Sequence, residues 1–518
     1  MKRFNVTGLC IPQMHYMVDI TNKINEIKKY IYQGEYFTIN RARQYGKTTV
    51  INELYHALKD EYLVIETSFE GLGEKAFSSE NEFCDSFINL ISKKLVQNNV
   101  LDGIIAEWET NKSKLEKFEE LSARVTELVK NVDKDVILII DEVDKSSDNQ
   151  LFLNFIGMLR TKYLESSKGM DKTFKSVVLA GVYDIKNLKL KLRPDAEKKY
   201  NSPWNIAARF TVDLSFNPDE ISTMLIDYEK DAMTGMDIYE ISRMIYEYTS
   251  GYPFLVSRLC KAIEEELNRN WTREGIEEAV KELLKEQNTL FDDIIKNIEN
   301  NKELDSMASD ILMEGTEYSF VQTNPTINIG IVFGIFIENK KGKVQIHNKI
   351  FELLLYNHFS IRQELKRRAL KQIPSSQFID ECGDLRIELI LNKFQELMQE
   401  EYRDQTREFA EKEGRLLFLA FIKPIINGEG FYFVEPETRN NMRLDMVITY
   451  NKKLFIIELK KWYGKEYEEK GHKQLADYLM TKKADKGYMV MFDFRKTVKE
   501  YSRAWLDVYG KSVYEVIV

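Results

Sequence analysis

Apolar residues in the first two hundred positions form short continuous runs, and longer stretches with helical spacing separate these runs. Continuous apolar runs are typical of strands that are covered on both faces. Strands that alternate with helices predict a parallel α/β sheet. The expected strands are residues 36–39, 62–65, 136–140, 177–180 and 210–214.

Beyond this region the pattern changes three times. From about residue 218 to residue 287 the chain has helical spacing, with an interruption at 249–253. The next helices end in a small hairpin, which is typical of a winged-helix module, and a Lys/Arg-rich helix near 363–371 then leads into a linker. The remainder predicts a helix, three strands, a helix and a strand. The chain is therefore expected to be an α/β protein of several domains.

The last part contains a predicted β-hairpin whose register can be counted. A two-residue turn at 451–452 lies between the β-rich runs 446–450 and 454–457. If these two residues form the whole loop, Tyr450 pairs with Lys453, and the other pairs follow by counting outward.

This register places Asp445 directly opposite Glu458, and Arg443 opposite Lys460. Directly opposed residues share one face of the sheet, with Cβ atoms roughly 5 Å apart. Two carboxylates at that distance repel each other, and a divalent cation is the usual compensation. Because Lys460 projects to the same face, where it can hold a phosphate or a metal-bound water, the hairpin predicts a metal site that hydrolyses phosphodiesters.

Composition narrows the class of protein. The 518 residues are 43% apolar and 30% charged, and no apolar run approaches the length of a membrane span. The first residues lack the apolar core of a signal peptide, so we expect a cytoplasmic protein. The net charge of -9 disfavours a nonspecific nucleic-acid coat but leaves room for a local basic groove. Widely scattered cysteines predict reduced thiols and no metal-binding spacing: Cys10, Cys84, Cys260 and Cys382.

A nucleotide site is predicted where Gly46, Lys47 and Thr48 follow a strand and open a helix. Backbone N–H groups at the helix start would cradle phosphates, Lys47 would reach the outer phosphates, and the Thr48 hydroxyl would bind magnesium. Arg41 stands where the first glycine of this motif is expected. The alternative is a Gly-Lys-Thr sequence that merely begins a helix.

A second motif favours the nucleotide interpretation. The apolar run 136–140 ends in Asp141 and Glu142, which is the Walker B arrangement. Asp141 would orient magnesium and Glu142 would polarise the attacking water. The alternative is a buried strand with ordinary solvated acids at its end. Both motifs occur in chain order, each after a predicted strand, although no arginine acting from a neighbouring subunit can be identified.

Residues 40–49 resemble the Arg-rich P-loop of bacterial AAA-like ATPases related to the STAND and archaeal-type families. Those families commonly lack the first P-loop glycine. The resemblance implies that Arg43 and Thr49 also belong to the nucleotide site. It makes Arg209 a candidate sensor of the γ-phosphate, with a surface arginine as the alternative. Pro253 would contact nucleotide from the Gly-x-Pro signature of the lid.

The resemblance extends over residues 1–360 through further short motifs. Residues 4–8 and 15–19 resemble the N-terminal segment that lies near the nucleotide base, although core packing is the alternative for His15. Residues 201–207 resemble the motif before the last core strand.

The C-terminal hairpin resembles the PD-(D/E)xK nuclease superfamily over residues 380–518, with Arg-Leu-Asp in place of Pro-Asp. By this resemblance, Asp445, Glu458 and the carbonyl of Leu459 would bind Mg2+ or Mn2+, and Lys460 would position the hydroxide or stabilise the charge that develops on the phosphate. A lone Glu-x-Lys sequence is weak evidence for a nuclease site, since exposed strands and helices often contain it.

The helix that follows strengthens this interpretation. Gln474 and Tyr478 match the Gln-x-x-x-Tyr extension of RecB-type members, lie on one helix face, and would orient the DNA backbone or the lysine. The superfamily also has an acid on the preceding helix, for which Glu413 is our choice, with Glu411 and Glu408 as alternatives.

We therefore expect an ATP-controlled deoxyribonuclease that uses ATP and Mg2+ (or Mn2+). Its partners would be nucleic acid, with DNA as the expectation of the superfamily, and further copies of itself in a homo-oligomer, but no membrane. The alternative is a STAND-like signalling switch whose nuclease-like domain only binds DNA or a protein. The expected domains are an ATPase core at 1–215, a helical lid at 216–290, a winged-helix-like module with linker at 291–372, and a restriction-endonuclease-like α/β/α domain at 373–518.

Overall fold

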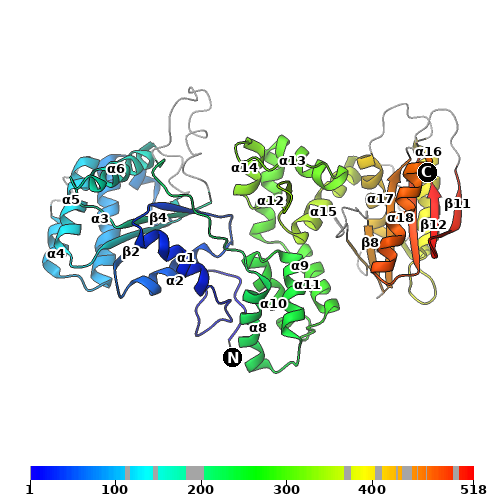
Figure 1. The fold of residues 1–518 in the computed structure, drawn as a ribbon, viewed down its shortest axis with the longest axis horizontal. Helices are drawn as coiled ribbons and strands as arrows, with labels where there is room; N and C mark the ends of the chain where they lie inside the picture. The colour runs from blue at the N-terminus through cyan, green and yellow to red at the C-terminus, as the bar shows by residue number, and fades with distance from the viewer. Residues whose placement is uncertain are drawn as a thin grey trace. The chain divides into compact units, whose positions relative to one another are not determined.

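The computed structural model describes two compact units of the chain (Figure 1). The first comprises Met1–Leu283 with Asn328–Ile335, and the second comprises Leu284–Ile327 with Phe336–Val518. Among the described residues, no helix is long and apolar enough to cross a membrane. The description covers residues 2–518 apart from 111–116, 144–149, 183–203, 367–374, 403–410, 427–429, 434–445, 452, 463 and 494–500.

A four-stranded parallel sheet forms the centre of the first unit, as the apolar runs predicted. The strand order is β1-β4-β3-β2, and every residue of β3 and β4 is buried. Parallel pairing brings the carboxyl ends of all four strands to one edge. The strands are β1 (Phe37–Asn40), β2 (Leu63–Ser68), β3 (Val136–Asp141) and β4 (Ser176–Gly181).

The fifth predicted strand, residues 210–214, is wrong. An isolated bridge joins Phe37 to Ala208, two residues before this segment, and the described residues 210–214 belong to no strand. The Arg41 guanidinium donates to the Val212 carbonyl at 2.6 Å, so a side chain takes the place of a ladder partner. The Phe210 ring stacks on Phe37. The apolar pattern of 210–214 therefore reflects packing against β1 and not strand pairing.

Helices cover both faces of this sheet. Alternate residues of β3 point to opposite faces, and Val136, Leu138 and Ile140 face a cluster rich in aromatic side chains. Phe83 and Phe155, whose ring centroids lie 5.1 Å apart, belong to this cluster. The helices of this part are α1 (Thr21–Tyr32), α2 (Lys47–Leu58), α3 (Glu80–Gln97), α4 (Asp102–Glu109), α5 (Phe118–Asn131) and α6 (Gln150–Ser167), with a short 3-10 helix, η1 (Glu74–Phe77).

Four helices follow the sheet, in the region where helical spacing was predicted. The first begins with a capping box, in which the Asn217 side chain accepts from the Glu220 N–H while the Glu220 carboxylate accepts from the Asn217 N–H. Pro218 occupies the first helical turn, where its missing N–H is not needed. The helices are α8 (Pro218–Ala232), α9 (Ile238–Thr249), α10 (Pro253–Glu265) and α11 (Arg273–Lys285).

Gly251, between α9 and α10, is required by a close approach of the backbone. Its φ is +73°, and its carbonyl accepts from the Phe216 N–H at 2.8 Å. A Cβ at this position would overlap the carbonyl oxygen of Phe216. Glycine therefore lets the start of α10 lie against the segment that leads into α8.

The second unit begins with helices and a two-stranded antiparallel hairpin that precedes a helix, in the order expected for the winged-helix-like region. The hairpin pairs Phe336 with Ile346. The elements are α12 (Thr289–Asn300), α13 (Lys302–Ser309), the π-helical turn η5 (Asp310–Glu314), β5 (Phe336–Glu338), β6 (Val344–Ile346) and α15 (Lys349–Lys366), while α14 (Pro325–Val332) spans the division between the units.

A six-stranded mixed sheet, in the order β11-β12-β10-β9-β8-β7, completes the second unit. The predicted series of helix, three strands, helix and strand is confirmed as α17, β7, β8, β9, α18 and β10. Two further strands, β11 and β12, were not predicted. The elements are η6 (Ser375–Phe378), α16 (Ile387–Tyr402), α17 (Glu411–Ile426), β7 (Gly430–Phe433), β8 (Met446–Tyr450), β9 (Lys453–Lys461), α18 (Lys465–Thr481), β10 (Lys486–Phe492), β11 (Arg503–Val508) and β12 (Lys511–Ile517).

The two faces of this sheet are covered by different helices. On one face, an added Cβ at Gly414 of α17 would lie 2.8 Å from the Phe492 ring of β10, and the Tyr514 hydroxyl of β12 donates to Asn392 of α16. On the other face, Gly471 of α18 lies against the side chains of Lys460 and Met489. Strand alternation then places Glu458 on the face that α18 covers.

Replacing Gly251 by alanine tests the close approach. A left-handed non-glycine residue usually costs about 1–3 kcal/mol. We expect Gly251→Ala to lower the free energy of unfolding by at least this amount, because the overlap with Phe216 adds to the cost. Thermal and denaturant unfolding followed by circular dichroism measure the change.

The matched control is Gly157→Ala in α6, where an added Cβ meets no atom within 4 Å among the described residues. This variant should be neutral or slightly stabilised, since alanine favours a helix over glycine. Equal stability of Gly251→Ala and wild type would contradict the geometry.

Candidate functional site

The predicted phosphate-binding loop has the geometry of a turn that opens a helix. Gly46 has φ of +77° and precedes α2. The side chain of Lys47 is buried, and its ammonium donates to the carbonyls of Arg41 and Ala42, each at 3.0 Å. The lysine therefore closes the loop on itself, and its positive charge lies beside the N–H groups at the start of α2.

The two nucleotide motifs meet at the carboxyl edge of the parallel sheet. The Thr48 hydroxyl donates to Asp141 Oδ2 at 3.2 Å. Asp141 is 6% exposed, and its other oxygen accepts from the Glu142 N–H at 2.8 Å. Hydroxyl and carboxylate oxygens are the donors that Mg2+ prefers, so this pair fits a magnesium ion.

Glu142 has a strained backbone. Its φ of +54° lies in the left-handed region, which costs a non-glycine residue of order 1–3 kcal/mol. The hydrogen bond from its N–H to Asp141 helps to hold this conformation. Strain of this kind is common at functional sites, and here it directs the residue after β3 away from the path of the strand.

Arg41, which replaces the first glycine of the motif, faces away from the phosphate loop. Its guanidinium donates to the carbonyls of Asn40 and Val212, and it lies over the ring of Phe210, 5.4 Å from the centroid. Burial lowers the pKa of this guanidinium. Arg41 therefore anchors the loop to the neighbouring segment.

A cavity of about 150 Å³ lies beside this loop. Its polar lining includes Asn5, Lys23 and Ser257, and Lys23 pairs with Glu220 at 2.9 Å. A mostly apolar cavity with a few polar groups is typical of a site for a planar ring such as a nucleotide base. The apolar walls are formed by Val6, Met17, Val18, Ile20, Val50, Leu214, Phe216, Met224, Pro253 and Phe254.

The structure brings several predicted residues to this cavity. Gly46, Thr49 and Pro253 line it, and a Cβ on Gly46 would lie 3.7 Å from the Pro253 ring. Of the described residues, Arg43 and Arg209 are exposed and do not line it.

His15 is also placed away from the lining. It is buried, and its Nδ1 accepts from the Ile11 N–H at 2.9 Å, so it organises the N-terminal loop. Burial, with a smaller contribution from Arg3, lowers its pKa.

Sequence reasoning missed how α10 reaches the loop. The Tyr252 hydroxyl donates to the Arg43 carbonyl at 2.6 Å, and the Tyr252 ring packs edge-on against Tyr45. Burial raises the pKa of Tyr45. The one available signal was the position of Tyr252 inside the Gly-x-Pro signature.

In the second unit, the hairpin has the predicted register. Tyr450 pairs with Lys453, and Met446 pairs with Ile457. The next position outward on β9 is Glu458, which counting places opposite Asp445. Asp445 and Arg443 lie outside the described residues.

Glu458 and Lys460 form a buried ion pair on the α18 face of the sheet. The Glu458 side chain is fully buried, and its Oε1 lies 2.9 Å from the Lys460 ammonium. The Lys460 side chain passes 3.5 Å from the position of a Cβ on Gly471, so a larger residue there would press on it. The Leu459 side chain is buried on the opposite face.

The remaining predicted residues lie on the helices that flank this sheet. Tyr478 is buried in α18, and Gln474 is half-buried one turn earlier. Glu413 and Glu411 lie in α17, on the opposite face from α18, and their side chains fall outside the description. Glu408 lies outside the described residues.

The donor chemistry fits a hard divalent cation. A buried carboxylate is costly unless it is paired, and here a lysine supplies one charge. Carboxylate oxygens are the ligands that Mg2+ and Mn2+ prefer.

The comparisons with known proteins cover about two thirds of the chain. A family model described as an AAA-like domain matches residues 15–352. No curated protein matches this sequence.

Three solved structures resemble part of the chain. The Walker-type ATPase of Pyrococcus abyssi is 10% identical, with a TM-score of 0.47, and covers 68% of this chain and 99% of its own. The ORC2 protein of Aeropyrum pernix, in ADPNP–ADP complexes, is 12% identical, with a TM-score of 0.34, over 67% and 93%. The ORC1 protein of Aeropyrum pernix, in complex with DNA, is 11% identical, with a TM-score of 0.29, over 68% and 94%. These TM-scores lie below 0.5, so none of the three decides the fold of this chain.

The pair Glu458–Lys460 predicts a large energetic coupling. Lys460→Met removes the cation beside a fully buried carboxylate, so we expect it to lower the free energy of unfolding by on the order of 3 kcal/mol. In the Glu458→Gln background the same change should cost much less. Urea denaturation of the wild type, both single variants and the double variant gives the coupling energy. Additive effects would show that the two groups do not interact.

Proposed function

The chain belongs to the AAA-like domain family, and on that premise we propose that its first unit binds and hydrolyses ATP. The observation that carries this proposal is the hydrogen bond between Thr48 of the phosphate loop and Asp141 at the end of β3. It joins the two motifs on which magnesium-dependent phosphoryl transfer rests.

Each residue of the loop has a role that its position supports. Lys47 would exchange its two loop carbonyls for phosphate oxygens, because both kinds of oxygen accept hydrogen bonds from an ammonium. Mg2+ held by Thr48 and Asp141 would neutralise charge on the outer phosphates. Glu142, whose backbone turns out of the strand, would accept a hydrogen bond from the attacking water.

The neighbouring cavity suits the base of the nucleotide. It adjoins Gly46 and Thr49, and its walls are mostly apolar. Pro253 contributes from the start of α10, so bound nucleotide would contact both the sheet part and the helical part of the first unit. This contact offers a way for the helices to respond to the nucleotide state.

We infer that the mixed sheet of the second unit is a metal-dependent nuclease that acts on DNA. Its support is the buried carboxylate of Glu458 beside Lys460, on a hairpin with the register from which Asp445 is predicted to lie opposite Glu458. When bound there, Mg2+ or Mn2+ would supply a Lewis acid for the phosphodiester. Lys460 would then turn from Glu458 to the phosphate oxygens, while Gln474 and Tyr478 of α18 orient the DNA backbone or the lysine.

One chain would carry both activities, so the nucleotide state would regulate cleavage. Copies of the chain would assemble for hydrolysis, since ATPases of this type often take an arginine from a neighbour. A signalling switch that only binds DNA or a protein is the competing function, and the cleavage test below separates the two.

Replacing Lys47 by alanine tests the ATP site. We expect Lys47→Ala to lose at least about 90% of ATP affinity, since a charged hydrogen bond to phosphate contributes about 1.5–3 kcal/mol. Isothermal titration with a slowly hydrolysed ATP analogue and magnesium measures the affinity.

The control is Lys59→Ala, which removes the same charge from the exposed far end of α2. It should bind like the wild type. Unchanged affinity in Lys47→Ala would reject the assigned loop.

Replacing Glu458 by glutamine tests the nuclease site. We expect Glu458→Gln to abolish Mn2+-dependent cleavage of plasmid DNA while ATP binding is retained, because the amide keeps the shape but removes a charged ligand. Gel assays with and without ATP measure cleavage and its control by nucleotide.

Glu466→Gln, on the exposed side of α18, is the matched control and should cleave normally. Cleavage that survives Glu458→Gln would reject the site. A wild-type chain that binds but never cuts DNA would favour the signalling switch.

A further inference from the structure

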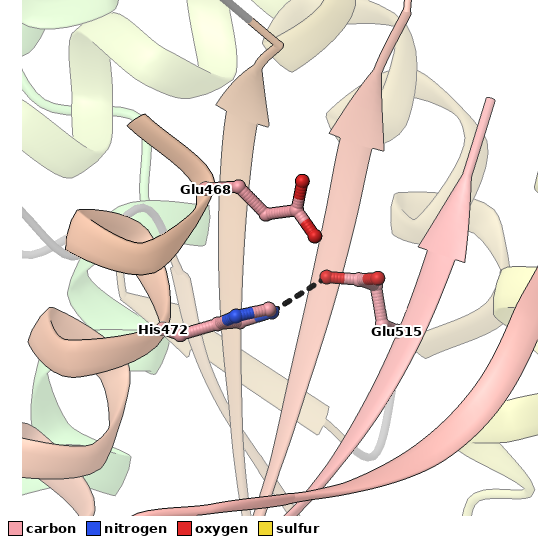
Figure 2. Close-up of side chains that lie close together, drawn as sticks. All are labelled: Glu468, His472 and Glu515. Atoms are coloured by element: carbon pink, nitrogen blue, oxygen red, sulfur yellow. Dashed lines mark hydrogen bonds and ion pairs between the residues drawn. The ribbon is translucent and has the colours of Figure 1, made fainter. Parts of the chain in front are cut away.

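A second group of metal-type ligands lies on the same sheet face as Glu458, between α18 and β12. His472 Nε2 is 2.7 Å from Glu515 Oε2, and a carboxylate oxygen of Glu468 completes a set whose ligand atoms all lie within 4.8 Å of one another (Figure 2). The sequence motifs did not point to any of these three residues.

The fold explains why the three side chains converge. Glu468 and His472 are four residues apart in α18 and so share one helix face. Glu515 of β12 is in register with Met489 of β10, which is in register with Glu458 of β9. Residues in such a row project to one side of a sheet, so Glu515 points toward α18.

The surroundings hold the ligands in place and leave a route for an ion. The Trp462 indole N–H donates to Glu468 Oε2 at 3.2 Å, and such outer partners orient ligating carboxylates. The His472 and Glu515 side chains are 15% and 9% exposed, so water competes little with a bound ion. Ala504 of β11 pairs with Glu515 and is small and exposed, which leaves the β11 side open.

We propose that Glu468, His472 and Glu515 form a binding site for a divalent transition-metal ion of the zinc type. Two ligands at about 2.1 Å from a tetrahedral zinc ion lie about 3.4 Å apart, so the His472 and Glu515 atoms, which are 2.7 Å apart in their hydrogen bond, would separate by several tenths of an ångström to admit the ion. One imidazole with two carboxylates selects Zn2+, Mn2+ or Co2+ over Mg2+, because Mg2+ prefers oxygen ligands alone.

This site is separate from the proposed nuclease centre. Glu515 and Glu458 lie two strands apart, or about 10 Å between their backbones, whereas paired catalytic ions lie about 3.5–4 Å apart. The metal would link α18 to β12. Since α18 also carries Gln474 and covers Lys460, the ion would fix the helix over the neighbouring centre without taking part in its chemistry.

Cobalt absorption tests the site in the full-length chain. Co2+ is titrated in the presence of excess Mg2+, which blocks oxygen-only sites, and Zn2+ is then added to displace it. We expect one visible absorption band that saturates at one ion per chain and is lost on adding Zn2+. His472→Ala and Glu515→Gln should weaken binding at least about tenfold, and Zn2+ should raise the unfolding temperature of the wild type but not of these variants.

Matched variants separate this site from the nuclease proposal. Glu458→Gln and Glu466→Gln should keep the cobalt band, so loss of the nuclease centre does not affect this result. Glu468→Gln provides a half-exposed ligand change if the more buried variants unfold. Bound Co2+ should also quench Trp462, and Trp462→Phe should remove that quenching while the band remains at saturation.

Two results would overturn the proposal. One is a wild-type chain with no cobalt band and no zinc-dependent rise in unfolding temperature, which would make the three residues a simple ion pair with a neighbouring acid. The other is a band that His472→Ala and Glu468→Gln leave unchanged, which would place the ion elsewhere.

Discussion

The cost of burying charge is the constraint on which both candidate sites depend. A charged side chain that leaves water loses several kcal/mol of solvation unless a partner of opposite charge or a set of hydrogen bonds replaces it. This chain nevertheless buries Lys47 and Asp141 at one sheet edge and Glu458 in the middle of another sheet. Each of the three has a polar partner on the same element or a neighbouring one. Such positions suit ligands that carry charge of their own, namely phosphates and divalent cations.

The two sheets bring these charges together in different ways. In the parallel sheet, every carboxyl end lies at one edge, so the loop after β1 and the end of β3 meet although about a hundred residues separate them. In the mixed sheet, an antiparallel hairpin gives the register, and a parallel neighbour, β10, supports its second strand. Helix α18 then covers the charged face. The first arrangement provides backbone N–H groups at a helix N-terminus, and the second provides a carboxylate enclosed between the sheet and α18.

Local patterns in the sequence were sufficient for part of this structure. Four strands of the parallel sheet follow from continuous apolar runs, and the hairpin register follows from a two-residue turn, because both depend on neighbouring residues. The segment 210–214 was assigned wrongly, since its apolar residues pack on β1 while the Arg41 side chain donates to the Val212 carbonyl. Strands β11 and β12 and the group around His472 depend on contacts between residues far apart in the chain. Such contacts leave no periodic signal in one sequence.

The central claim is that the buried carboxylate of Glu458 is a ligand for a divalent cation. Anomalous diffraction at the manganese edge, from crystals of the full chain grown with Mn2+ and an ATP analogue, tests it most directly. The account predicts a peak within coordination distance of Glu458, with the Asp445 carboxylate on the other side of the ion. A peak between Thr48 and Asp141 in the same crystal would show that Mn2+ had entered the crystal. That peak without one at Glu458, whose carboxylate would then be paired with Lys460 and bind no ion, would contradict the claim.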